Sequence, residues 1–158
     1  MTYQEFKTLA KELSETDSKT RESEIREKIF IAARKVLIWV CGTYSRFGRR
    51  YVDDSDFQLD KGHLCLDDDY GFVHGDKVNL RYWDHWRYGG ECDIGIDVDM
   101  TLLDPKNRIK LRNSLAKQYI KVLENNIKDN NRQITYLQTE TQKLSEKLEN
   151  LKKKYEGV

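Results

Sequence analysis

The sequence is poor in proline and cysteine. Pro105 is its only proline in 158 residues. The three cysteines, Cys41, Cys65 and Cys92, are odd in number, far apart and without CxxC spacing, which argues against a disulfide framework and a zinc ribbon. We expect them to be buried free thiols in a reducing cytoplasm.

Long apolar runs are also missing. No stretch approaches the roughly 18 apolar residues needed to cross a bilayer. The N-terminal MTYQEFKTLAKEL lacks the basic start and apolar block of a signal peptide. Hydrophobic residues make up 38% of the chain and charged residues 35%, which is lean for a compact globule, so part of the chain should be extended and solvated. These features predict a cytoplasmic protein without membrane contact.

The common catalytic and metal-binding motifs are absent. There is no lysine-bearing phosphate loop, no GxSxG and no HExxH. The acidic run 67–69 with Gly71 lacks the EF-hand spacing and predicts a solvated turn. His63, His74 and His85 are too dispersed to indicate zinc. We therefore expect a protein that is not an enzyme and that holds neither cofactor nor metal.

Charge is strongly segregated although the net charge is only +1. Residues 1–52 carry 11 Lys/Arg and 7 Asp/Glu, a net charge of +4. Residues 53–104 carry 4 and 14, a net charge of −10, and residues 105–158 carry 13 and 6, a net charge of +7. An acidic middle and a basic tail set which partners each part of the surface attracts.

Helical periodicity predicts two N-terminal helices, at 3–14 and 20–41. Thr2 and Glu5 have the spacing of a capping box. Gly42 should end the second helix and open a flexible basic loop. Four further apolar residues widen the apolar stripe of the second helix and predict burial of its last turns on most sides: Phe30, Ile31, Ile38 and Trp39.

The next part of the chain predicts a small antiparallel sheet, with the sequence HGD at 74–76 as one turn. The expected strands lie at 51–58, 63–66, 70–74, 77–88 and 92–100. The fold class is therefore α+β, with a globular domain at 1–104.

Residues 105–158 predict one long helix that forms a coiled coil. Asp104 is an N-cap candidate and Pro105 fits the first helical position. Apolar residues step by four and three for more than five heptads, and isoleucine at a with leucine at d favours two parallel strands. The seam expected to drive oligomerisation contains Ile120, Leu123, Ile127, Asn130, Ile134, Leu137, Leu144, Leu148 and Leu151. A homodimer is the first expectation; antiparallel pairing, another partner helix, or packing on the chain's own domain remain open.

The stretch NLRYWDHWRYGGECDIGIDVDM, residues 79–100, predicts a hairpin. Pairing Tyr88 with Cys92 around a three-residue loop gathers the apolar side chains on one face. On the other face, this register sets Arg81 against Asp99, Arg87 against Asp93, and Trp83 against Asp97. It also places Asp84 on the apolar face opposite Ile96, which predicts a bulge or a place at the sheet edge.

Four residues of the charged face are the candidate partner-binding site: Trp83, Asp93, Asp97 and Asp99. An exposed tryptophan beside ion pairs is typical of an interface anchor. Nucleic-acid binding is not expected here, because the arginines have carboxylate partners. We expect a non-enzymatic interaction module that presents an acidic, aromatic β-face to a basic protein partner.

Three alternatives remain open. Asp97 and Asp99 form an Asp-x-Asp that could hold Mg²⁺ in a phosphotransfer enzyme. A small protein with an acidic surface of this kind could also be a mobile-element or phage-encoded inhibitor that mimics the charge of a nucleic acid. The basic run Lys152, Lys153 and Lys154 could bind nucleic acid.

Overall fold

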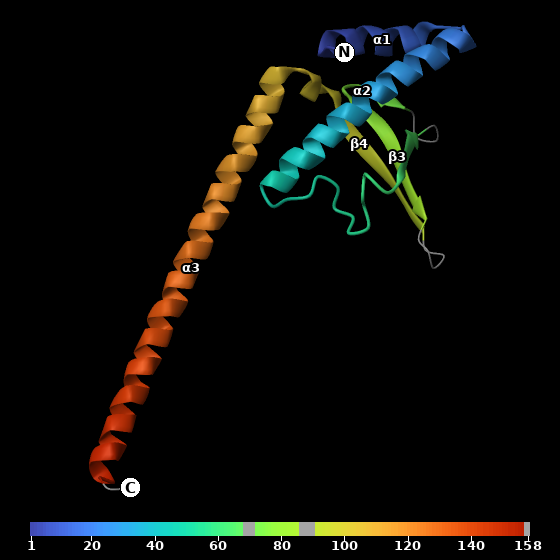
Figure 1. The fold of residues 1–158 in the computed structure, drawn as a ribbon. Helices are drawn as coiled ribbons and strands as arrows, with labels where there is room; N and C mark the ends of the chain where they lie inside the picture. Colours follow the sequence, from blue (N-terminus) through green and yellow to red (C-terminus); the bar gives the residue numbers. More distant parts are fainter. Residues whose placement is uncertain (68–71, 86–90, 157–158) are drawn as a thin grey trace. The chain divides into compact units, whose positions relative to one another are not determined.

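The computed structural model describes residues 1–67, 72–85 and 91–156, and it is α+β. Two N-terminal helices precede a small antiparallel sheet, and one long helix ends the chain (Figure 1). The chain divides into two compact units, Met1–Leu115 and Ala116–Val158. No helix of the described residues is long and apolar enough to cross a membrane.

The first helix, α1 (Tyr3–Glu15), begins at the predicted capping box. The Glu5 amide donates to the Thr2 hydroxyl at 3.1 Å, and the Thr2 amide donates to the Glu5 carboxylate at 2.6 Å. These two bonds satisfy amides that a helix start otherwise leaves without partners. Phe6 is the buried residue of α1 and joins it to the core.

The second helix, α2 (Lys19–Arg46), passes through Gly42, so the predicted end there was wrong. The glycine is exposed, while the next residue, Thr43, is buried and donates its hydroxyl to the Trp39 carbonyl at 2.8 Å. Burial on either side outweighs the entropic cost of one glycine. The chain leaves the helix at Gly48, whose φ of 66° suits a residue without Cβ.

The predicted burial of α2 on most sides was wrong for two residues. Ile31 and Ile38 are 47% and 46% exposed, whereas Phe30 and Trp39 are partly buried. The helix therefore keeps one apolar strip at the surface.

The predicted strand at 51–58 was also wrong, because these residues have irregular structure. Individual side chains of this segment, rather than backbone pairing, attach it to the sheet. The Tyr51 hydroxyl donates to the Asp97 carbonyl at 2.6 Å, and the Phe57 ring lies 4.7 Å from the Tyr82 ring, centroid to centroid. The aromatic residues of 51–58 do pack against the core, but the segment does not pair its backbone with a strand.

The sheet contains β1 (His63–Leu66), β2 (Val73–His74), β3 (Lys77–His85) and β4 (Glu91–Asp99). The central strand β3 pairs with β4 along its whole length. The short strands β1 and β2 pair with different parts of β3, so they share its other edge.

The turn between β2 and β3 lies within the predicted 74–76 segment, and Gly75 takes a φ of 57°. Residues 70–71 of the third predicted strand and 86–88 of the fourth lie outside the described residues. The last predicted strand ends one residue early, because Met100 begins the 3-10 helix η1 (Met100–Leu103).

The predicted hairpin register was wrong by four residues. Cys92 pairs with Asp84 rather than with Tyr88, and Trp83 pairs with Asp93 rather than with Asp97. A shift by an even number keeps every side chain on its predicted face. Thus the buried face of β3 is still the predicted one, although Tyr88, Trp86 and Arg87 lie outside the described residues.

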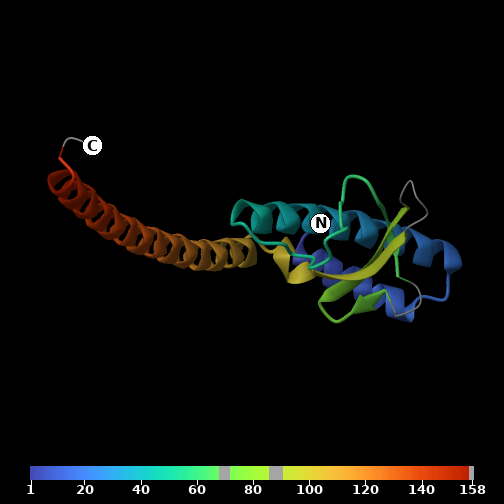
Figure 2. The same ribbon diagram turned by 90° about the horizontal axis from the view of Figure 1, so that it is seen from below.

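The core lies between the helices and one face of the sheet, and α2 packs against β1 and β4 (Figures 1 and 2). We call this buried side the inner face of the sheet. The largest fully buried side chains of the core come from the helices and from the sheet: Tyr82, Phe6, Ile25, Ile29, Leu37, Leu80, Met100, Val40, Val78 and Val98. Most side chains on the opposite, outer face are polar.

The long helix α3 (Pro105–Lys154) begins at the predicted proline. The Asp104 carboxylate accepts the Lys106 amide at 2.9 Å, as a capping residue does. Leu115, 2% exposed, is the buried residue of α3. The unit 1–115 therefore includes the first turns of α3.

Candidate functional site

The outer face of the sheet carries all four predicted partner-binding residues. Trp83 lies on β3, and Asp93, Asp97 and Asp99 lie on β4. Because side chains alternate along a strand, the odd-numbered residues of both strands share this face. The structure thus brings the four residues to one surface.

A polar groove with a volume of about 670 Å³ runs across this face. We call it the acidic groove. It is lined by Asp67, His74, Asn79, Arg81, Asp93, Gly95 and Asp97. The lining contains three carboxylates and one guanidinium, so the groove favours a cationic occupant.

Gly95 makes room for the acidic groove. A Cβ at this position would meet only one neighbouring atom within 4 Å, the Asp67 Oδ2 at 3.8 Å. Asp67 itself is 6% exposed, so the prediction that it belongs to a solvated turn was wrong; residues 68 and 69 lie outside the described residues. No pattern in the sequence predicts that this carboxylate, which follows β1, lies close to a glycine of β4.

The ion pair of Arg81 with Asp93 is the best-defined polar contact in the groove. Arg81 Nε lies 2.7 Å from Asp93 Oδ1, and Nη2 lies 2.6 Å from Oδ2. The hydrogen bonds from Arg81, with a smaller contribution from its charge, lower the pKa of Asp93. The predicted pairing of Arg81 with Asp99 was wrong, because the register places Gly95 opposite Arg81.

Asp97 and Asp99 have separate partners. Asn79 Nδ2 donates to Asp97 Oδ1 at 2.7 Å. Asp99 Oδ1 accepts from the Thr101 amide at 3.0 Å and from the Thr101 hydroxyl at 2.6 Å, which caps η1. Asp99 therefore has a structural task in addition to its place on the face. The Asn79 Oδ1 atom is buried without a partner among the described residues.

Trp83 lies in a three-ring stack that sequence reasoning missed. Its ring centroid is 6.0 Å from that of His63 and 5.9 Å from that of His85, at interplanar angles of 23° and 19°. His63 is its partner on β1, and His85 follows two positions along β3. The spacing of Trp83 and His85 was visible in the sequence, but the pairing with His63 needed the register. The tryptophan remains 39% exposed.

Asp84 is opposite Cys92 rather than Ile96, near the end of β3. Its carboxylate accepts the His85 amide at 2.8 Å and lies 3.5 Å from the Tyr82 hydroxyl. One-to-one pairing continues past it, so no bulge is present in the described part of the hairpin.

The predicted oligomerisation residues lie on α3, in the unit that begins at Ala116. Their side chains are exposed, for example by 60% for Ile127, 62% for Leu137 and 66% for Leu144. We call the residues Ile120, Leu123, Ile127, Asn130, Ile134, Leu137, Leu144, Leu148 and Leu151 the α3 seam. It is a second candidate interaction surface.

Metal ligands are not grouped in the part of the chain that the structure describes. Within 1–67, 72–85 and 91–156, no three His, Cys, Asp or Glu side chains come together as a metal site would require. Comparisons with protein-family models, curated proteins and solved structures found no match for this chain.

Proposed function

We propose that the protein is a non-enzymatic interaction module that self-associates through the α3 seam and presents its acidic outer β-face to a basic protein partner. The observation that carries the proposal is the exposure of the seam. Apolar side chains recur at a and d positions over five heptads, yet stay open to solvent in the single chain. Exposed apolar stripes of this length are typical of helices that pair.

Packing energetics support pairing with a second copy. Burying one leucine or isoleucine contributes about 1.5–3 kcal/mol, and each chain offers eight such residues. In proteins, most of the stability of a helix comes from packing of its apolar face rather than from helix propensity. Pairing two seams would supply this packing and bury the apolar side chains.

The chemistry of the outer face supports a basic partner. Trp83 offers a large, half-exposed ring, and the acidic groove offers the carboxylates of Asp93 and Asp97 beside it. A lysine or arginine of the partner can enter the groove and also contact the indole. A nucleic-acid-binding protein is one class of partner that meets this description.

Self-association is tested by sedimentation of two matched variants. Leu137 and Tyr136 are neighbours with exposed fractions of 62% and 65%, but only Leu137 lies in the seam. Leu137→Asp should raise the dissociation constant at least a hundredfold, whereas Tyr136→Asp should leave it within about threefold. A wild-type chain that stays monomeric at 100 μM, or equal effects of the two variants, would refute self-association through the seam.

Partner recognition is tested with wild-type and variant protein as bait in lysate of the native host. Trp83→Ala should weaken binding of a basic partner about thirtyfold, the effect of losing a hot-spot residue of about 2 kcal/mol. Asp97→Asn should also weaken binding of this partner, and it should make the binding less dependent on salt concentration. Asp17→Asn, an exposed carboxylate between α1 and α2, is the charge-matched control. Retention of the same partner by Trp83→Ala and Asp97→Asn would place recognition elsewhere.

A further inference from the structure

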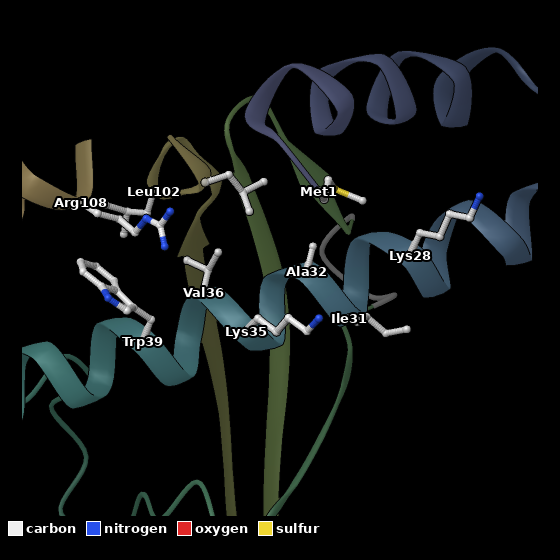
Figure 3. A pocket seen from close by; sticks show the side chains of 10 residues that line it. Met1, Lys28, Ile31, Ala32, Lys35, Val36, Trp39, Leu102 and Arg108 are labelled. Carbon is white, nitrogen blue, oxygen red and sulfur yellow. The ribbon is translucent and has the colours of Figure 1, made fainter. Parts of the chain in front are cut away.

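An apolar pocket with a volume of about 380 Å³ lies within the unit 1–115, between α2, η1 and the start of α3 (Figure 3). Its apolar wall includes Val36, Trp39 and Leu102. Ile31, which was expected to be buried, stands at its edge and is 47% exposed. Pockets that bind small ligands have volumes of about 300–1,000 Å³ and apolar walls with a few polar groups.

The charged side chains that line this pocket are all cationic. Lys28, Lys35 and Arg108 line it, and no Asp or Glu is among the described residues that do. Lys28 and Lys35 are seven residues apart, which places them on one side of α2 at a separation of about 10 Å along the axis. The Arg108 guanidinium lies 5.9 Å from the centre of the Trp39 ring.

None of these three cations forms an ion pair with a carboxylate within the described part of the chain, although the charge of Lys28 helps to lower the pKa of Glu12. The ion pairs found there involve other residues. The positive charges of Lys35 and Arg108 are therefore not neutralised by an ion pair at the rim. An apolar pocket under such a rim suits a ligand with an apolar body and one anionic end.

We propose that this pocket binds a small carboxylate-bearing amphiphile, with the apolar chain against Val36, Trp39 and Leu102 and the carboxylate between Lys35 and Arg108. A purely polar anion would leave the apolar wall wet, and a cationic amphiphile would be repelled by the rim. The small volume favours a single medium-length chain over a large ring system. The site uses neither the acidic groove nor the α3 seam, so it stands independently of the proposed function.

The test uses the full chain, with decanoate as probe and decanol as its neutral counterpart, both below their aggregation concentrations. Binding is followed in the nuclear magnetic resonance signals of the three tryptophan indole N–H groups, and Trp39→Phe assigns the relevant one. Decanoate should shift the Trp39 signal saturably at one site per chain and leave the Trp83 signal in place. Decanol should bind at least tenfold more weakly. Equal affinities, or no shift at Trp39, would overturn the proposal.

Two matched pairs of variants locate the site. The double variant Lys35→Gln/Arg108→Gln should weaken decanoate binding at least tenfold without changing decanol binding, whereas Arg34→Gln, an exposed cation outside the pocket lining, should change neither.

Ile31→Glu should abolish decanoate binding, because it adds a negative charge at the pocket edge. Ile38→Glu is its control, since Ile38 is 46% exposed on the same helix but outside the lining. All five substituted positions are exposed or partly exposed, so the fold should survive. The same decanoate affinity in the two glutamate variants would refute the site.

Discussion

Arg81 and Asp93 form a two-point ion pair although they are not opposite each other in the sheet. Arg81 pairs with Gly95, and its guanidinium reaches along the outer face to the next residue of β4 on that face. The contact therefore depends on the observed register, and it lowers the pKa of Asp93.

Replacing Arg81 by glutamine should raise the pKa of Asp93 toward its ordinary value of about 3.9. A carboxyl whose pKa is lower in the folded state stabilises the fold above its unfolded pKa, and this contribution disappears as the pH falls through the folded pKa. The variant should thus be less stable than wild type at pH 7, and the difference should vanish below the lowered pKa. Carboxyl NMR titration and urea unfolding at several pH values measure both effects.

Lys77→Gln is the control for this prediction, because it removes another cation from the same strand and face. It should leave the Asp93 pKa unchanged. An Asp93 pKa that does not move in Arg81→Gln would show that the ion pair is not populated in solution.

Sequence patterns predicted the fold because each helix carries its own periodicity and caps. They could identify the buried face of β3 but not its register. Face follows from alternation within one strand, whereas register depends on the connection between two strands. The stack of His63 on Trp83 and the closeness of Asp67 to Gly95 were missed for the same reason, since both follow from pairing between strands.

The extension of α2 past Gly42 was missed for a different reason. Glycine frequently ends a helix. Beyond Gly42, however, Thr43 is buried and Tyr44 packs against the core. This tertiary burial overrides the low helix propensity of the glycine. Local composition was also misleading at 51–58. The aromatic residues of this segment resemble those of a strand, but they contact the sheet through their side chains only.

Two glycine-to-alanine changes should shift stability in opposite directions. A Cβ at Gly62 would overlap Cε2, Cζ and the hydroxyl oxygen of Tyr82, which is fully buried. Gly62→Ala should therefore destabilise the fold by about 1–3 kcal/mol, the usual cost of overpacking.

A Cβ at Gly42 would meet nothing within 4 Å, and the residue is helical. Gly42→Ala should stabilise the fold by about 0.5–1 kcal/mol. Urea unfolding of the two variants measures both effects. A stabilised Gly62→Ala would contradict the packing of Tyr82 over Gly62, and a destabilised Gly42→Ala would contradict the continuation of α2.

The three thiols should react in a defined order. Cys65 is exposed and Cys41 is only partly buried, so the prediction that all three cysteines are buried was wrong for these two. Burial raises the pKa of Cys41 to about 11, and burial together with nearby aspartates raises the pKa of Cys92. Because the thiolate is the reactive form, iodoacetamide at pH 8 should modify Cys65 first. Peptide mass spectrometry after timed quenching gives the order of modification. In unfolded protein, the three cysteines should react at similar rates. Equal rates in folded protein would contradict the burial of Cys41 and Cys92.

Asn130 is the polar residue at a d position of the α3 seam, and its replacement tests how the seam specifies pairing. Asn130→Leu should raise the thermal midpoint of the helix at a fixed protein concentration, because a buried amide is replaced by an apolar side chain. It should also broaden the distribution of oligomeric states, because the amide no longer penalises shifted registers.

Asn125→Leu is the matched control, since Asn125 is exposed on the same helix and lies outside the seam. It should alter neither the midpoint nor the oligomeric state. Circular dichroism melting and sedimentation measure the two readouts. A lower midpoint in Asn130→Leu than in wild type would mean that the amide makes a favourable contact in the pair, so that Asn130 would stabilise association as well as restricting it.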